Sequence, residues 1–161
     1  YMKGFENDRS WIIEKKNDIA IRAMDNKEKT DQFIEKRDTV EEGIARIPTD
    51  LPEDIQRQID TAIQNVRNEL KEERKELEDE ANEIQESADD VLDKADMIGN
   101  DLKEKGNKLK DISLIPIIGS IADTKADEIF DQAEQISDLR QETQKYQDDL
   151  IHSRNRLFEN R

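Results

Sequence analysis

The architecture of this chain follows from residues 52–112, PEDIQRQIDTAIQNVRNELKEERKELEDEANEIQESADDVLDKADMIGNDLKEKGNKLKDI. Apolar residues recur there every three or four positions, which is a helical period, because a strand would repeat every second residue. If helical throughout, the segment would be about 90 Å long at 1.5 Å per residue, too long for a compact globule. The repeating residues are Ile59, Ile63, Val66, Leu70, Leu77, Ala81, Ile84, Ala88, Val91, Ala95, Ile98, Leu102, Leu109 and Ile112.

Two further helices are predicted on either side of this segment, at about residues 4–46 and 121–158. Pro48 and Pro52 end the first helix, because a residue before proline disfavours the helical conformation. Pro116 prevents a continuous helix through the turn at 113–120. The central helix, about 52–112, allows a break near 99–106, where Gly99 and Gly106 each cost roughly 1 kcal/mol relative to alanine.

Short connections make consecutive helices antiparallel neighbours. The sequence therefore predicts one all-α domain over residues 1–161, an elongated antiparallel three-helix bundle or coiled coil with a long central helix. Counting outward from the turns, the first helix should cover roughly residues 53–95 of the central helix and the third roughly 72–112. This leaves two-helix ends with apolar stripes. The polar seam residues Asn26 and Thr30 should lie opposite residues near 70–74.

Composition excludes several classes of function. The net charge is -15, and residues 76–101 carry 11 acids against one base. Such a surface repels nucleic acid and, at neutral pH, anionic membranes. The chain has no cysteine, which excludes disulfides and thiolate chemistry. A cytoplasmic location and a secreted bacterial one both fit this absence.

Catalytic and metal-binding patterns are weak. The one histidine, His152, forms an acid-x-x-His pair with Asp149, but a di-iron bundle needs such a pair from two helices. A calcium site at Asp89, Asp90, Asp93 and Asp96 is disfavoured, since calcium loops need a bent backbone and these residues radiate from one helix. No phosphate-binding glycine motif occurs. We therefore expect no cofactor, no metal and no enzymatic activity.

Two apolar segments are candidate interaction sites. Trp11, Ile12 and Ile13 are three consecutive large residues, more than one seam can bury. At least one is therefore expected to face a further helix, either from a partner chain or from the rest of a longer parent protein. The apolar loop, defined as residues 112–122, is the only densely apolar stretch. It either caps the end of a helical hairpin or contacts a membrane or protein through its large side chains and proline. These candidate contact residues are Leu114, Ile115, Pro116, Ile117, Ile118 and Ile121.

The segment Leu114–Asp123 resembles the short apolar Pro/Gly segments of bacterial polymorphic toxins and the apolar tip between long helices in helical pore-forming toxins. The long helices that flank it resemble the helical modules that precede toxin domains in Gram-positive type VII secretion effectors. The Trp-x-Gly turn of those modules is replaced here by Ile47-Pro48-Thr49-Asp50. These resemblances imply a role in a secreted bacterial toxin or effector system.

Together these patterns predict a non-enzymatic helical scaffold that pairs with another helical chain, either a different protein or a second copy. The alternative is a membrane-active helical protein that uses residues 112–122 as its membrane-contacting tip. Nucleic acid is not expected as a partner.

Overall fold

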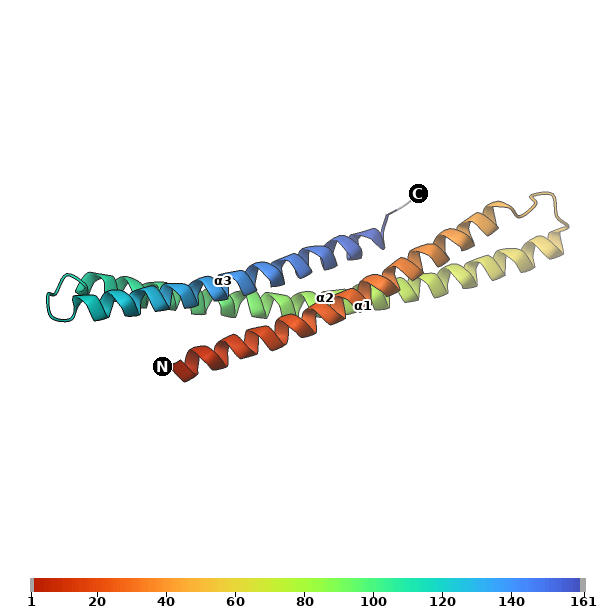
Figure 1. Ribbon diagram of the computed structural model, residues 1–161. Coiled ribbons are helices and arrows are strands. Elements are labelled where there is room, and N and C mark those ends of the chain that lie inside the picture. Colours follow the sequence, from red (N-terminus) through yellow and green to blue (C-terminus); the bar gives the residue numbers. More distant parts are fainter. Residues whose placement is uncertain (1, 160–161) are drawn as a thin grey trace. The chain divides into compact units, whose positions relative to one another are not determined.

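The computed structural model describes the main chain of residues 2–159 and the side chains of residues 4–159. Within that range it contains three helices and no strand: α1 (Met2–Ala45), α2 (Glu53–Ile112) and α3 (Gly119–Arg156) (Figure 1). The prediction of an all-α, antiparallel three-helix bundle with a long central helix is confirmed. The predicted helix ends agree with the observed ends to within two residues.

The prolines act at the helix ends as expected. α2 begins directly after Pro52, whose carbonyl accepts a hydrogen bond from the Gln56 N–H at 2.9 Å. Glu53 and Asp54 occupy the first turn of α2, where a negative charge is favourable next to the unpaired N–H groups. At the other end, Arg154 and Arg156 occupy the last turn of α3, where positive charge is favourable.

α2 is helical throughout, so the break allowed near 99–106 is not formed. The structure explains one of the two glycines. Gly106 is buried, and a Cβ built there would lie only 2.6 Å from Cε1 of Phe130 on α3. The glycine therefore lets the Phe130 ring approach the helix backbone. Nothing lies within 4 Å of a Cβ at Gly99, which is tolerated as an ordinary helical residue.

The chain packs as two compact units. Unit 1 comprises residues 1–21 and 85–148, and unit 2 comprises residues 22–84 and 149–161. Each unit contains a section of all three helices. That the chain forms a single domain remains a prediction.

In unit 1, α1 and α3 run parallel and α2 runs antiparallel to both. Arg9 donates a hydrogen bond to Gln135, and Lys16 pairs with Glu142, seven residues further along both helices. Phe5 lies beside Ile98 and Leu102, so α1 covers α2 further than the predicted limit near residue 95. The buried apolar residues of this unit are Phe5, Ile12, Ile19, Ala88, Val91, Leu92, Ala95, Leu102, Ala122, Ala126, Ile129, Ala133 and Ile136.

Unit 2 has a smaller core with a polar layer. Phe33 of α1, Leu70 of α2 and Leu157, the first residue after α3, form a buried cluster. The buried polar residues are Asn26, Thr30 and Ser153. The remaining buried apolar residues of the unit are Ala23, Ala81, Ile84 and Leu150.

The predicted register of α1 against α2 is wrong in unit 2. Asn26 does not lie opposite residues 70–74, because its Nδ2 donates to the Leu77 carbonyl and to Glu80 Oε1, both at 3.2 Å. The connection at 46–52 is the physical reason. Glu41 pairs with Arg67, so the end of α1 at Ala45 is level with a residue about ten positions into α2. The connection runs along the start of α2 instead of turning tightly.

Candidate interaction surfaces

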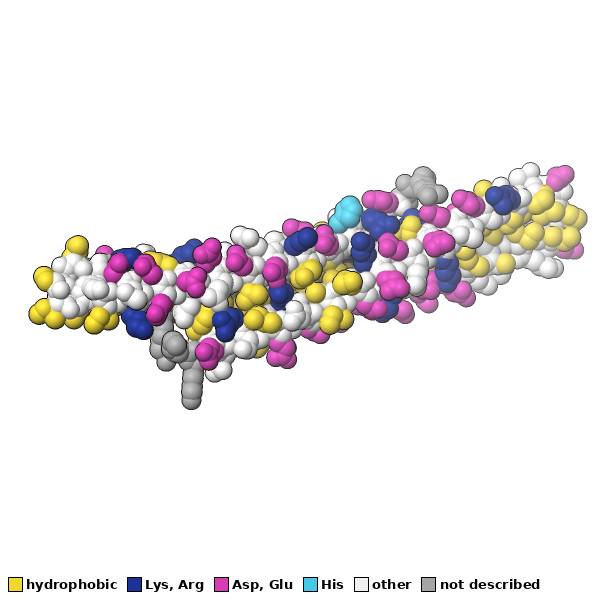
Figure 2. All heavy atoms as spheres, viewed as in Figure 1, with side chains coloured by type: hydrophobic (Ala, Val, Ile, Leu, Met, Phe, Trp, Pro, Cys, Tyr) yellow, Lys and Arg dark blue, Asp and Glu magenta, His cyan; other side chains and the backbone are white. Residues whose placement is uncertain are grey.

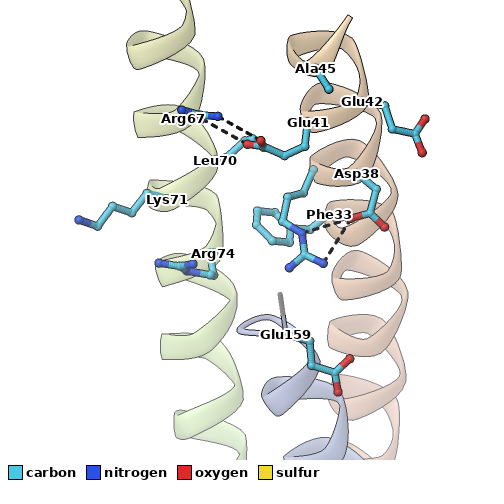
Figure 3. Close-up of a pocket in the computed structure, with 11 residues that line it drawn as sticks. Phe33, Asp38, Glu41, Glu42, Ala45, Arg67, Leu70, Lys71, Arg74 and Glu159 are labelled. Carbon is cyan, nitrogen blue, oxygen red and sulfur yellow. Dashed lines mark hydrogen bonds and ion pairs between the residues drawn. The ribbon is translucent and has the colours of Figure 1, made fainter. Parts of the chain in front are cut away.

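A groove lies between α1 and α2 in unit 2, at the point where α3 ends (Figure 3). Phe33 and Leu70 are buried residues in its lining, and Glu159 lines it from the end of the chain segment that follows α3. The groove has a volume of about 700 Å³. We call it the α1–α2 groove. Its lining residues are Phe33, Arg37, Asp38, Glu41, Glu42, Ala45, Arg67, Leu70, Lys71, Arg74 and Glu159.

An apolar stripe continues from the groove toward the end of the α1–α2 hairpin. None of the described residues from Ile34 to Glu69 is buried, although this segment continues the apolar repeat of both helices. Its apolar side chains are partly covered by the neighbouring helix and otherwise open. Figure 2 shows hydrophobic side chains gathered at this end of the hairpin. We define the apolar stripe as five half-buried residues, Val40, Ile44, Ile59, Ile63 and Val66.

Charged side chains of both signs surround the groove. Arg67 makes two hydrogen bonds to the Glu41 carboxylate, at 3.1 and 3.3 Å (Figure 3). Arg37 pairs with Asp38 and also donates to the Leu157 carbonyl at the end of α3. The lining as a whole contains four cations and four carboxylates. It therefore suits an amphipathic surface with both charge signs better than an isolated anion or cation.

The apolar loop of unit 1 lies at the end of the α2–α3 hairpin (Figure 1), and its large apolar side chains are exposed. Leu114 is 87 % exposed and Ile117 is 90 % exposed. Ile115, Ile118 and Ile121 are also exposed, as is Pro116. The interpretation of this loop as a cap that seals the hairpin is therefore wrong, because a cap would bury these residues.

An ion-pair network closes the base of the loop. Lys110 at the end of α2 pairs with Asp123 and, at 3.0 Å, with Asp127 on α3. Hydrogen bonds to Asp123 and then to Asp127 raise the pKa of Lys110 above its ordinary value of 10.5. The lysine therefore stays protonated at any physiological pH.

The cluster at residues 11–13 is divided between core and surface. Ile12 is fully buried in unit 1. Trp11 is half-buried, with Lys94 Nζ 4.2 Å from its ring centroid. Ile13 alone is exposed. Ile12 thus packs within the chain, and a partner contact by Ile13 or by the remaining face of Trp11 stays a prediction.

The described residues contain no group of three or more His, Cys, Asp or Glu side chains that could hold a metal ion. His152 is exposed on α3. The acidic residues of α2 are partly engaged in contacts between helices, such as Asp89 with Gln147 and Asp96 with Arg140.

None of the three described helices is long and apolar enough to cross a lipid bilayer.

Sequence reasoning anticipated two-helix ends but did not identify the residues of the α1–α2 groove. Arg37 is the clearest example, because nothing in the helical repeat shows that it donates to the carbonyl of Leu157, directly after α3. The signal for the apolar stripe was present in the repeat from Ile59 to Val66. The repeat does not show whether a third helix covers those residues.

No protein-family model, no curated protein and no solved structure matches the sequence or fold of this chain.

Proposed function

We propose that this chain is a non-enzymatic helical interaction module, which pairs with another helical chain through the α1–α2 groove and the apolar stripe. The observation that carries the proposal is that no described residue between Ile34 and Glu69 is buried, although the apolar repeat continues through this segment. A contiguous apolar surface that is left partly exposed in this way is typical of interaction sites.

The occupant we propose is a second copy of the same hairpin. Two antiparallel helices that present one apolar stripe can pack face to face with an identical pair, giving a four-helix arrangement with twofold symmetry. Both stripes would then be covered by the same residues of the other copy. Ile59 and Ile63, one turn apart on α2, would form the centre of the contact.

Charge also favours self-association at this place. Two chains of net charge -15 repel one another over most of their surfaces. The groove lining is an exception, because its four cations balance its four carboxylates. Two copies can therefore approach at this lining without a net electrostatic repulsion between the two linings.

The experiment is sedimentation velocity over a wide range of protein concentration. The wild-type chain should shift from monomer to dimer as its concentration rises. Ile63→Asp should remain a monomer with unchanged helicity, because Ile63 is only half-buried. A wild-type chain that is monomeric at every concentration would overturn the second copy as occupant.

Disulfide cross-linking provides a matched control, because the native chain contains no cysteine. Ile59→Cys lies on the proposed contact and should form covalent dimers under mild oxidation. Thr61→Cys is exposed on the opposite side of α2 and should not. Equal cross-linking of both variants would indicate random collision instead of a specific contact.

Membership of a secreted bacterial toxin or effector system stays a prediction from the sequence.

A further inference from the structure

We infer that the apolar loop of unit 1 is a docking tip for the surface of a lipid bilayer, and that a zwitterionic bilayer is sufficient for it. This inference concerns a different surface from the α1–α2 groove and does not depend on self-association. It rests on the exposure of the loop, on the way its backbone is held and on its charge.

The exposure of the loop is unusual for this chain. Six of its large apolar residues are exposed, and the three most exposed are Leu114, Ile117 and Ile121, at 87 %, 90 % and 65 %. Other exposed large apolar residues lie along the helices in smaller numbers, such as the neighbours Ile21 and Met24 and the single residue Met97. Among the described residues, only the apolar loop contains six exposed large apolar side chains within eleven consecutive positions.

The backbone holds these side chains outward in an ordered turn. Ser113 donates from both its N–H and its hydroxyl to the Lys110 carbonyl, at 3.1 and 2.6 Å. The Ile115 N–H donates to Ile112, and the Gly119 N–H donates back to Ile115 at 2.7 Å. Backbone groups that are already paired lose less on entering an apolar environment than unpaired groups do.

Gly119 is required for this turn. A Cβ at Gly119 would collide with the Ser113 carbonyl oxygen. The close approach joins the end of α2 to the start of α3, and the Lys110 pairs with Asp123 and Asp127 brace the same junction. The loop is therefore an ordered part of the hairpin, and its large apolar side chains are exposed instead of buried in the core.

The tip carries no net charge, although the chain as a whole is strongly acidic. Residues 103–128 contain five lysines and five carboxylates, whereas the whole chain has a net charge of -15. A neutral tip carries no long-range repulsion toward a zwitterionic surface. The acidic remainder of the chain is repelled by anionic lipid. Binding should therefore be at least as strong to zwitterionic as to anionic vesicles.

The size of the tip favours a bilayer over a protein partner. Stable protein interfaces use roughly 20–30 residues on each side. The apolar loop has eleven residues, and they sit on a turn instead of lining a groove. A bilayer needs no such area, because a few apolar side chains can enter the boundary between headgroups and acyl chains.

The test is co-flotation of the whole chain with phosphatidylcholine vesicles, compared with vesicles that also contain phosphatidylserine. The wild-type chain should float with phosphatidylcholine alone, and added phosphatidylserine should not increase the bound fraction. The double variant Leu114→Asp, Ile117→Asp should bind at least tenfold less. Its helicity should be unchanged, because both side chains lie outside the core.

Ile21→Asp is the matched control. Ile21 is 69 % exposed and also belongs to unit 1, but it lies on α1 away from the loop. This variant should bind like the wild type. Equal loss in both variants would show that added negative charge alone reduces binding, and would overturn the inference. Absence of wild-type flotation, or flotation that requires phosphatidylserine, would overturn it as well.

A second measurement does not depend on the aspartate variants. Ile117→Cys carries the only cysteine of its chain and can be labelled with an environment-sensitive fluorophore. Its emission should shift to the blue on addition of phosphatidylcholine vesicles, and the same label at Ile21→Cys should not respond. A response at residue 21 alone would contradict docking through the loop. A response of residue 117 to protein concentration without vesicles would indicate a contact between copies, and would also overturn the inference.

Discussion

The ring of Phe130 on α3 lies directly against Gly106 on α2, so closely that a Cβ at residue 106 would be 2.6 Å from Cε1 of the ring. Gly99, seven residues earlier on the same helix, has nothing within 4 Å of the corresponding position. A side chain at residue 106 would therefore clash with Phe130, whereas a side chain at residue 99 would meet no obstacle. An alanine substitution at each position tests this difference.

We expect Gly99→Ala to raise the free energy of unfolding by roughly 0.5–1 kcal/mol, because alanine is the better helix former and meets no obstacle. Gly106→Ala should bring no such gain, since the Phe130 ring must move away from the helix. Urea denaturation of the two variants measures the difference. An equal gain in both would show that the Phe130 contact is unimportant.

Leu157 should be important for the stability of unit 2, and its neighbour Phe158 should not. Leu157 is fully buried with Phe33 and Leu70, so Leu157→Ala should lower the free energy of unfolding by roughly 2–4 kcal/mol. Phe158 is exposed, and its ring contacts the Arg74 guanidinium at 4.9 Å. Phe158→Ala should cost less than about 1 kcal/mol, the usual value of an exposed cation–π contact. Thermal or urea unfolding checks the order, and a reversed order would contradict the packing described for this unit.

Asn26 is a polar residue in the core of unit 2 whose replacement should stabilise the fold. Its Nδ2 is paired with Leu77 and Glu80, but its buried Oδ1 has no hydrogen-bond partner. Asn26→Leu should therefore raise the unfolding free energy by about 1 kcal/mol or more. The same change removes a buried polar side chain that helps to select the register, so a broader unfolding transition is expected. Asn26→Ala, which leaves a cavity, serves as the control and should lower stability.

The Lys110 contacts predict a loss of stability at alkaline pH. The pKa of Lys110 is raised above 10.5 in the folded state by Asp123 and Asp127, so the folded chain holds this proton more tightly than the unfolded chain. The contribution is therefore fully present below pH 10.5 and is lost as the pH rises through the folded pKa. The stability difference between the wild type and Lys110→Met should disappear at the top of this range. A difference that is constant from neutral to strongly alkaline pH would rule out the ion pairs as its source.

Local sequence signals were sufficient for the helices themselves. The apolar repeat of residues 52–112 identifies α2, and Pro48, Pro52, Pro116 and Gly119 mark the connections. These signals are local, since a proline or a helical repeat acts through neighbouring backbone atoms. The identity of the partner has no such local signal, and the helix pairing predicted from the seams stays a prediction.

Register could not be obtained in the same way. An apolar seam repeats about every seven residues, so sliding one helix along another by one repeat restores nearly the same apolar contacts. This is why Asn26 was expected opposite residues 70–74 but is bonded to Leu77 and Glu80. Only particular side chains, such as the Phe33, Leu70 and Leu157 cluster, distinguish one register from the next.

The sequence by itself determined three helices, their order and their antiparallel course, because backbone propensity and the apolar period act over a few residues. Packing in three dimensions determined which apolar residues are covered. It left the stripe from Val40 to Val66 half-open and turned Leu114 and Ile117 outward. Burial of a side chain depends on whether another helix reaches it. That is a property of chain segments distant in sequence, and no local pattern records it.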